Sequence, residues 1–141
     1  MKMKDITVRG LVEEDLVEVS QWFINRKWFA PPNGKILPED TGYVAEIDGR
    51  LLSVAWLYIT NSHIGIIDWI ATNPESGTMG LKSIKKLLDY IEEVSRENIT
   101  TYMHFTSNER FAKYIGKNCR FKPREKGVSI CMRTRKEVAH G

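Results

Sequence analysis

The stretch that most constrains the fold is "DWIATNPESGTMGLKSIKKLLDYIEE", from Asp68 to Glu93. A strand-like run stops at Asn73-Pro74, and Gly77 and Gly80 follow before a helical pattern begins. The expected apolar face of that helix holds Leu81, Ile84, Leu88 and Ile91, with Leu87 and Val94 beside them. A strand that leads into a helix and then into a second strand favours a right-handed parallel crossover, here from 64 to 106.

The other segments predict a mixed sheet with helices on its faces. Two β-rich runs flank Asp48-Gly49, a strong signal for a two-residue hairpin turn, and with the run at 63–72 they form a three-strand antiparallel meander. Ser107 or Asn108 can cap a helix over 109–118. The remaining segments are a strand over 5–11, a helix over 12–26, a loop over 31–42, a strand over 99–106 and a closing hairpin over 120–133. The predicted order is β-α-β-β-β-α-β-α-β-β.

Length and composition predict one folded domain over residues 1–141. Apolar residues make up 42% and charged residues 28%, which argues against disorder. No apolar run approaches the ~20 residues that a membrane span needs, and no apolar segment follows the basic start, so we expect no membrane partner, no signal peptide and a cytoplasmic location. Cys119 and Cys131 lack the spacing of a metal site and are interpreted as reduced thiols.

The loop before the long helix suits a phosphate-bearing ligand. A helix N-terminus offers unpaired N–H groups and the positive end of the helix dipole, and glycines let phosphate approach closely. Lys82, Lys85 and Lys86 add positive charge. A plain turn with solvated lysines explains the same residues and stays open as an alternative. Neither a Walker A loop nor a dinucleotide-binding GxGxxG motif is present.

The element order and this loop together resemble the GNAT superfamily of acyl-CoA-dependent N-acetyltransferases over nearly the whole chain. In that family a strand runs into (D/N)P and then into a Q/R-x-x-G-x-G/A loop, whose central glycine falls on Gly80. Gly77 stands at the Q/R position and Lys82 at the last position. The family pattern N-x-x-A-x-x-x-Y-x-x-x-G-F is similar to "NERFAKYIGKNCRF", although the spacing differs by one in places and Arg120 replaces the glycine.

The resemblance implies a GNAT-like, mostly antiparallel sheet of six to seven strands with three to four helices. It implies transfer of an acetyl group from acetyl-CoA to a primary amine by direct attack. The implied cofactor-binding residues are Ala71, Thr72, Gly77, Thr78, Met79, Gly80, Leu81, Lys82 and Asn108. Many family members dimerise, so a homodimer is left open, as are the amine acceptor and the preferred acyl length.

Two residues are candidates for the proton transfers of this chemistry. Asp68 lies where many family members carry a glutamate base, and an apolar neighbourhood would make its carboxylate a better base. Strand alternation predicts that Asp68, Ile70 and Thr72 share one face. Tyr114 stands on the helix where the family places the tyrosine that protonates the leaving thiolate. A solvated or ion-paired Asp68, a packing Tyr114 and a merely capping Asn108 remain alternatives.

Other reactive or aromatic residues receive structural interpretations. His104 has no second ligand at metal-binding spacing, so no metal is expected, and Cys119 has no histidine partner for nucleophilic catalysis. Trp22, Trp28 and Phe29 fall in the region that caps the acceptor pocket in the family, where aromatics can hold an apolar or cationic acceptor. Core packing also explains Trp22.

Two other function classes compete with the enzyme. Basic residues from Lys117 to Lys136 could contact nucleic acid, but the acidic residues of the first helix break any continuous basic stripe, which argues against it. The second rival is a catalytically inactive GNAT-like interaction module. Its basis is the loop, where Gly77 and Lys82 depart from the family pattern.

Overall fold

The computed structural model describes residues 5–28 and 37–122 and separates the chain into two compact units, with the boundary between His104 and Phe105. The first unit contains β1 (Thr7–Gly10), α1 (Glu13–Asn25), β2 (Gly42–Ile47), β3 (Arg50–Ile59), β4 (Ile64–Thr72), α2 (Gly77–Ser95) and β5 (Thr101–Met103). The second unit contains α3 (Glu109–Asn118). Each unit is described by itself.

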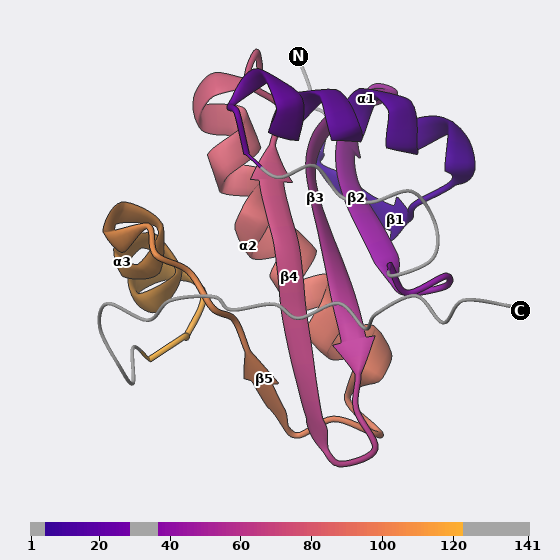
Figure 1. Cartoon of the computed structure of the whole chain (residues 1–141), viewed down its shortest axis with the longest axis vertical. Helices are drawn as coiled ribbons and strands as arrows, with labels where there is room; N and C mark the ends of the chain where they lie inside the picture. The colour runs from indigo at the N-terminus through magenta and orange to yellow at the C-terminus, as the bar shows by residue number, and fades with distance from the viewer. Residues whose placement is uncertain (1–4, 29–36, 123–141) are drawn as a thin grey trace, which may run out of the picture. The chain divides into compact units, whose positions relative to one another are not determined.

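The sheet of the first unit has five strands in the order β1-β2-β3-β4-β5 (Figure 1). Neighbouring strands are antiparallel from β1 to β4, whereas β5 pairs with β4 in parallel. The mixed, mostly antiparallel sheet, its meander and its parallel crossover pair are therefore confirmed. The described residues give five strands rather than six or seven, and the closing hairpin predicted over 120–133 falls almost entirely outside them.

The hairpin turn between β2 and β3 forms at the predicted dipeptide. Asp48 and Gly49 have φ angles of 53° and 76°, so both central residues occupy the left-handed region. This is the conformation of a type I′ turn, whose twist matches that of the flanking strands. The Asp-Gly signal therefore fixed the β2–β3 connection.

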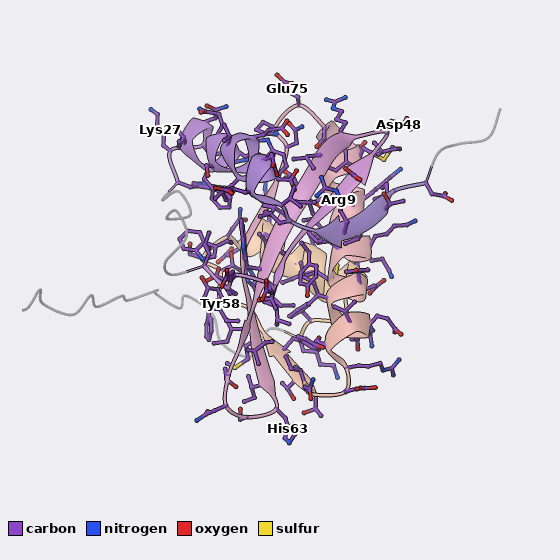
Figure 2. All side chains as sticks on the ribbon, turned by 90° about the vertical axis from the view of Figure 1, so that its right-hand side faces the viewer. Arg9, Lys27, Asp48, Tyr58, His63 and Glu75 are labelled. Carbon is purple, nitrogen blue, oxygen red and sulfur yellow. The ribbon has the colours of Figure 1, made fainter. Side chains whose placement is uncertain are left out.

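The two long helices cover opposite faces of the sheet (Figures 1 and 2). Under α1, an apolar cluster joins Val19, Trp22 and Phe23 to Val54 and Trp56 of β3. On α2 the buried apolar residues are Ile84, Leu87, Leu88 and Ile91. Leu81 and Val94 are 39% and 50% exposed, so placing Leu81 on the buried face was wrong. Its position is taken by Gly80, where α2 lies close to the sheet.

A buried carboxylate ties α1 to the sheet. Asp15 accepts hydrogen bonds from both terminal nitrogens of the Arg9 guanidinium, at 2.7 and 3.0 Å, and from the Val12 N–H at 2.9 Å. Arg9 also pairs with Glu46 on β2 at 3.2 Å. The hydrogen bond from Arg9 lowers the pKa of Asp15. The carboxylates of Asp15 and Glu46 in turn raise the pKa of Arg9. The acidic start of α1 is therefore anchored to β1 and β2.

The second unit begins with a capped helix. The side chain of Asn108 accepts a hydrogen bond from the Phe111 N–H at 3.1 Å, so Asn108 rather than Ser107 caps α3. Ile115 and Cys119 are buried, and Cys119 is a free thiol. Among the helices of the described residues, none has the length and apolarity needed to cross a membrane.

Candidate active site

A bulge in β4 organises the candidate site. Val54 and Trp56 of β3 lie opposite Ala71 and Asp68 of β4. One residue separates the pair on β3 and two residues separate the pair on β4, so β4 carries one extra residue here. Trp69 at this point has a φ of 55°, which is uncommon for a residue other than glycine. Its N–H donates to Oδ1 of Asp68 at 2.8 Å.

The bulge overturns the alternation that the sequence suggested. Residues opposite Val54 and Trp56 face the same side, so Asp68 and Ala71 share the face covered by α1. Thr72 lies opposite Ser53 and faces the other side. Asp68 and Thr72 therefore do not share a face, because the extra residue shifts the two-residue period.

Two aromatic residues surround the bulge on the α1 face. The indole N–H of Trp69 donates to the hydroxyl oxygen of Tyr58 at 2.8 Å, and the Trp69 ring meets Phe23 edge-on at 6.1 Å between centroids. Burial raises the pKa of Tyr58, and the charge of Asp68 raises it further. Tyr58 thus stays protonated at neutral pH beside the candidate base. Sequence reasoning missed Tyr58, since nothing in its strand sets it apart from a packing tyrosine.

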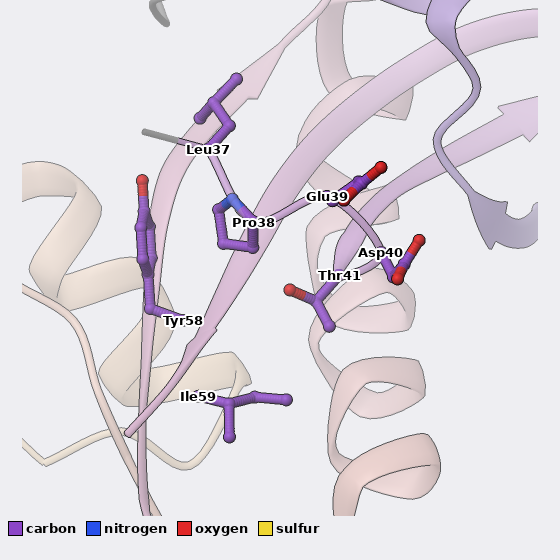
Figure 3. A pocket seen from close by; sticks show the side chains of 7 residues that line it. All are labelled: Leu37, Pro38, Glu39, Asp40, Thr41, Tyr58 and Ile59. Atoms are coloured by element: carbon purple, nitrogen blue, oxygen red, sulfur yellow. The ribbon is translucent and has the colours of Figure 1, made fainter. Parts of the chain in front are cut away.

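A pocket of about 500 Å³ opens beside Tyr58 (Figure 3). Its lining residues are Leu37, Pro38, Glu39, Asp40, Thr41, Tyr58 and Ile59. In Figure 3 the carboxylates of Glu39 and Asp40 point away from the Tyr58 ring, and Pro38 lies between that ring and Glu39. Residues 37–41 of this lining belong to the loop predicted over 31–42, whereas Phe29 falls outside the described residues.

His104 lies where β4 and β5 stop pairing. In the described residues, β5 pairs with Ile64, Gly65 and Ile66, while β4 continues to Thr72 (Figure 1). Nδ1 of His104 lies 2.8 Å from the carbonyl oxygen of Ile67, the next residue of β4. Burial lowers the pKa of His104, while the Ile67 bond and the Asp68 charge act in the opposite direction. Within the described ranges, no group of three potential ligand residues could hold a metal ion.

The loop after β4 is fastened at Asn73. Its N–H and side-chain amide donate to the carbonyls of Leu52 and Leu51, at 2.8 and 3.0 Å. Its own side-chain and backbone oxygens accept from Glu75 and Ser76. The next residues, Gly77 and Thr78, are exposed, and Gly77 has a φ of 55°. The loop therefore presents the first turn of α2, where N–H groups lack helical partners.

Gly80 has a different role from the one expected. A Cβ atom there would lie 2.1 Å from Oγ of Ser76 and within 3.3 Å of Thr72 Cβ and the Leu52 carbonyl. An added side chain at Gly80 would thus point into the packed helix–sheet contact, and not toward a phosphate at the exposed loop. At Gly77, by contrast, an added Cβ would meet nothing within 4 Å.

The three lysines of α2 are not equivalent. Lys82 is exposed near the start of the helix. Lys85 pairs with Asp89 at 2.7 Å, and Nζ of Lys86 lies 3.4 Å from the carbonyl oxygen of Ile6. Met79 is half-buried, its N–H bound to the Ser76 carbonyl at 3.2 Å, and Leu81 is exposed. Lys82 is accordingly the lysine best placed to add charge at the loop.

A further basic residue, Arg26, reaches the end of β4. Its guanidinium donates to the carbonyl oxygen of Thr72 at 2.7 Å and to Oγ1 of the same residue at 3.1 Å, and it lies 5.0 Å from the centre of the Trp28 ring. Burial lowers its pKa. Arg26 therefore binds Thr72, one of the cofactor-binding residues that the resemblance implies, and the sequence did not indicate this contact.

Asn108 and Tyr114 belong to the second unit, on and next to α3. Tyr114 is half-buried, and burial raises the pKa of its hydroxyl, with a smaller contribution from Cys119. A raised pKa keeps the hydroxyl protonated at neutral pH, as a proton donor requires.

Comparison with solved structures finds acetyltransferases of the same fold. An acetyltransferase of Trypanosoma brucei superposes with a TM-score of 0.67 at 19% identity, over 91% of this chain and 100% of that one. AAC(6')-Iy, bound to a CoA-containing bisubstrate analogue, gives 0.64 at 15% identity, over 92% and 99%. N-acetylglutamate synthase of Neisseria gonorrhoeae, complexed with coenzyme A and L-arginine, gives 0.62 at 20%, over 79% of this chain and 27% of that longer one. No family model matches the sequence, and no curated protein does either.

Proposed function

We propose that this protein, whose fold is that of the GNAT acetyltransferases, transfers an acetyl group from acetyl-CoA to a primary amine by direct attack. The observation that carries the proposal is the bulged end of β4, which lies beyond the β5 pairing and leads directly into the exposed N-terminus of α2. The N–H groups at the start of α2 suit the pyrophosphate of an acyl-CoA, and the resemblance implies that the arm of the donor lies along the end of β4.

The loop and the first turn of α2 would hold the phosphates. Gly77 and Thr78 are exposed there, and Lys82 adds charge one turn later. Met79 to Leu81 continue the helix, with Gly80 allowing its close approach to the sheet. Ala71 and Thr72 would line the arm of the donor, and Asn108 is proposed to contact it from the second unit. These assignments follow the resemblance and the exposure of the loop.

Acetyl transfer requires one proton to leave the amine and one to reach the leaving sulfur. We assign the first to Asp68, or to a water that it holds, because its carboxylate is fixed by the Trp69 N–H at the bulge. We assign the second to Tyr114, whose pKa is raised by burial. The amine nitrogen forms a bond to the carbonyl carbon, the carbon–sulfur bond breaks, and the sulfur leaves with the electron pair.

The transfer is tested by following release of free CoA thiol with a panel of primary amines. Wild-type protein should release thiol with at least one amine and form the matching amide by mass spectrometry. The Tyr114→Phe variant should lose turnover, by roughly tenfold or more, while its affinity for acetyl-CoA stays unchanged. Wild-type turnover in this variant would remove Tyr114 from the mechanism.

The inactive interaction module is the second candidate. It is favoured by Gly77 and Lys82, which stand where the family carries Q/R and G/A. Binding of acetyl-CoA separates the two candidates, since a module that has lost its ligand would show neither heat of binding nor thiol release.

A further inference from the structure

We propose that His104 is a further catalytic residue, whose Nε2 atom receives the proton that leaves the attacking amine. This inference rests on the proposed acetyl transfer and extends it. It assigns the final position of the proton, whereas Asp68 draws the proton from the amine and stabilises the charge that results.

The hydrogen bond of His104 defines its tautomer. A carbonyl oxygen can only accept, so the 2.8 Å contact with the Ile67 oxygen requires the proton to be on Nδ1. In the neutral ring the basic lone pair is then on Nε2, whatever group that atom faces. The bond to a backbone group of β4 also fixes the ring plane. His104 is thus a neutral base held in one orientation.

The position of the ring matches the reacting part of the site. His104 follows Met103, the last residue of β5 that pairs with β4. Its ring contacts the carbonyl of Ile67, one residue before Asp68 and two before the bulged Trp69. It therefore lies where β4 begins to extend beyond β5. In the proposed function, the base Asp68 lies next along this strand, and the arm of the donor follows at Ala71 and Thr72.

The surrounding charges suit a group that is neutral before the reaction and charged after it. Burial lowers the pKa of His104, so the ring is neutral at pH 7 and able to accept a proton. The carboxylate of Asp68 on β4 acts in the opposite direction and stabilises the imidazolium once it forms. Tyr58 on β3, whose pKa is raised, remains uncharged beside Asp68. Asp68 is therefore the counter-charge to the protonated ring.

The proton balance is simple. As the amine nitrogen bonds to the carbonyl carbon, its N–H proton passes to Asp68, or to the water that Asp68 holds, and from there to Nε2 of His104. The carbon–sulfur bond breaks, and the sulfur takes its proton from Tyr114. The imidazolium releases its proton to solvent before the next turnover, and the tyrosine is reprotonated from solvent.

The first test needs no activity. Nitrogen-15 spectra of the three histidines report which ring nitrogen carries the proton, and the His104→Asn variant assigns the signal. We expect a neutral ring at pH 7, protonated on Nδ1, with a pKa below the ordinary value of 6.5. A ring protonated on Nε2 in its neutral form, or still charged at pH 7, would overturn the proposal.

The second test is kinetic. In His104→Asn, the side-chain amide can still donate to the Ile67 carbonyl but cannot accept a proton as a base. We expect acetyl-CoA affinity and thermal stability close to wild type, and a fall in kcat/KM of about 100-fold near neutral pH. The fall should shrink at high pH, where hydroxide can accept the N–H proton of the attacking amine in place of the ring.

His63 provides the matched control. Its Nδ1 makes the same kind of contact, 3.0 Å from the Asn98 carbonyl, but it is exposed at the far end of the unit (Figure 2). His63→Asn should have wild-type kinetics. If His104→Asn has the wild-type rate and pH profile, the proposal is wrong and the acetyl transfer stands. If wild-type protein transfers no acetyl group to any amine, the proposed function fails and the role of His104 fails with it.

Discussion

Asp68 combines a structural contact with a charge, and two substitutions separate them. Its Oδ1 accepts a hydrogen bond from the Trp69 N–H at the bulge. Asp68→Asn keeps an acceptor oxygen and loses the charge, so we expect near-wild-type stability and turnover reduced by about 100-fold. Asp68→Ala also loses the acceptor and should lower the free energy of unfolding by roughly 1–2 kcal/mol. Urea unfolding and thiol release check both variants, and full turnover in Asp68→Asn would exclude the carboxylate from catalysis.

At Gly80 the structure predicts a loss of stability. An alanine Cβ would displace the Ser76 hydroxyl, which donates to the Asn73 carbonyl at 2.6 Å. We expect Gly80→Ala to cost about 1–2 kcal/mol in urea unfolding despite the better helix propensity of alanine. The cost should be smaller in a Ser76→Ala background, where the clashing hydroxyl is gone. If Gly80→Ala lowers the free energy of unfolding equally in the wild-type and Ser76→Ala backgrounds, the contact with Ser76 is not the cause.

At the scale of elements, the Arg9–Asp15 pair links β1 to the start of α1. Because the folded-state pKa of Asp15 lies below its ordinary value of 3.8, the pair stabilises the fold above that pH and loses its effect as pH falls through and below it. Arg9→Met should lower the free energy of unfolding at pH 7 by roughly 1–2 kcal/mol. This loss of stability is smaller than for a fully buried ion pair, because the Arg9 side chain is 37% exposed.

Urea unfolding of wild type and Arg9→Met at pH 7 and at pH 3 measures this effect. The difference between the two proteins should narrow at the acidic pH, because Asp15 takes up a proton more readily in the unfolded protein than beside Arg9 in the folded one. An unchanged difference would indicate that Arg9 contributes through packing alone.

The N-terminus of α2 can be tested with one added negative charge. Thr78→Asp places a carboxylate at the exposed first turn, where it suits the helix dipole and repels phosphate. Asn98→Asp adds the same charge just past the other end of this 19-residue helix, ~28 Å away. We expect acetyl-CoA affinity to fall tenfold or more in Thr78→Asp and to stay unchanged in Asn98→Asp. Equal affinities would mean that phosphate binds elsewhere.

At the scale of the whole molecule, local signals predicted the elements well. Asp48-Gly49 formed its turn, Asn108 capped α3, and α3 spans the residues that its pattern indicated. The element order was sufficient for the fold, because short connections leave few ways to arrange a meander and one parallel crossover.

The details of the candidate site were less predictable. The bulge at Trp69 depends on tertiary packing against Phe23 and Tyr58, so period-two alternation placed Asp68 and Thr72 on one face. Gly80 carried a family motif whose local purpose is helix–sheet packing. His104 and Arg26 contact β4 across 37 and 46 residues of sequence, and no local pattern indicates such contacts.

The proposed activity depends on the binding of acetyl-CoA at the loop after β4. Isothermal titration of the wild-type protein with acetyl-CoA, and with CoA and ATP in parallel, tests it most directly. We predict micromolar binding of acetyl-CoA and a weaker response to ATP, which shares the phosphates and adenine but lacks the pantetheine arm. No heat with any of the three ligands would contradict the account and leave a GNAT fold without its cofactor.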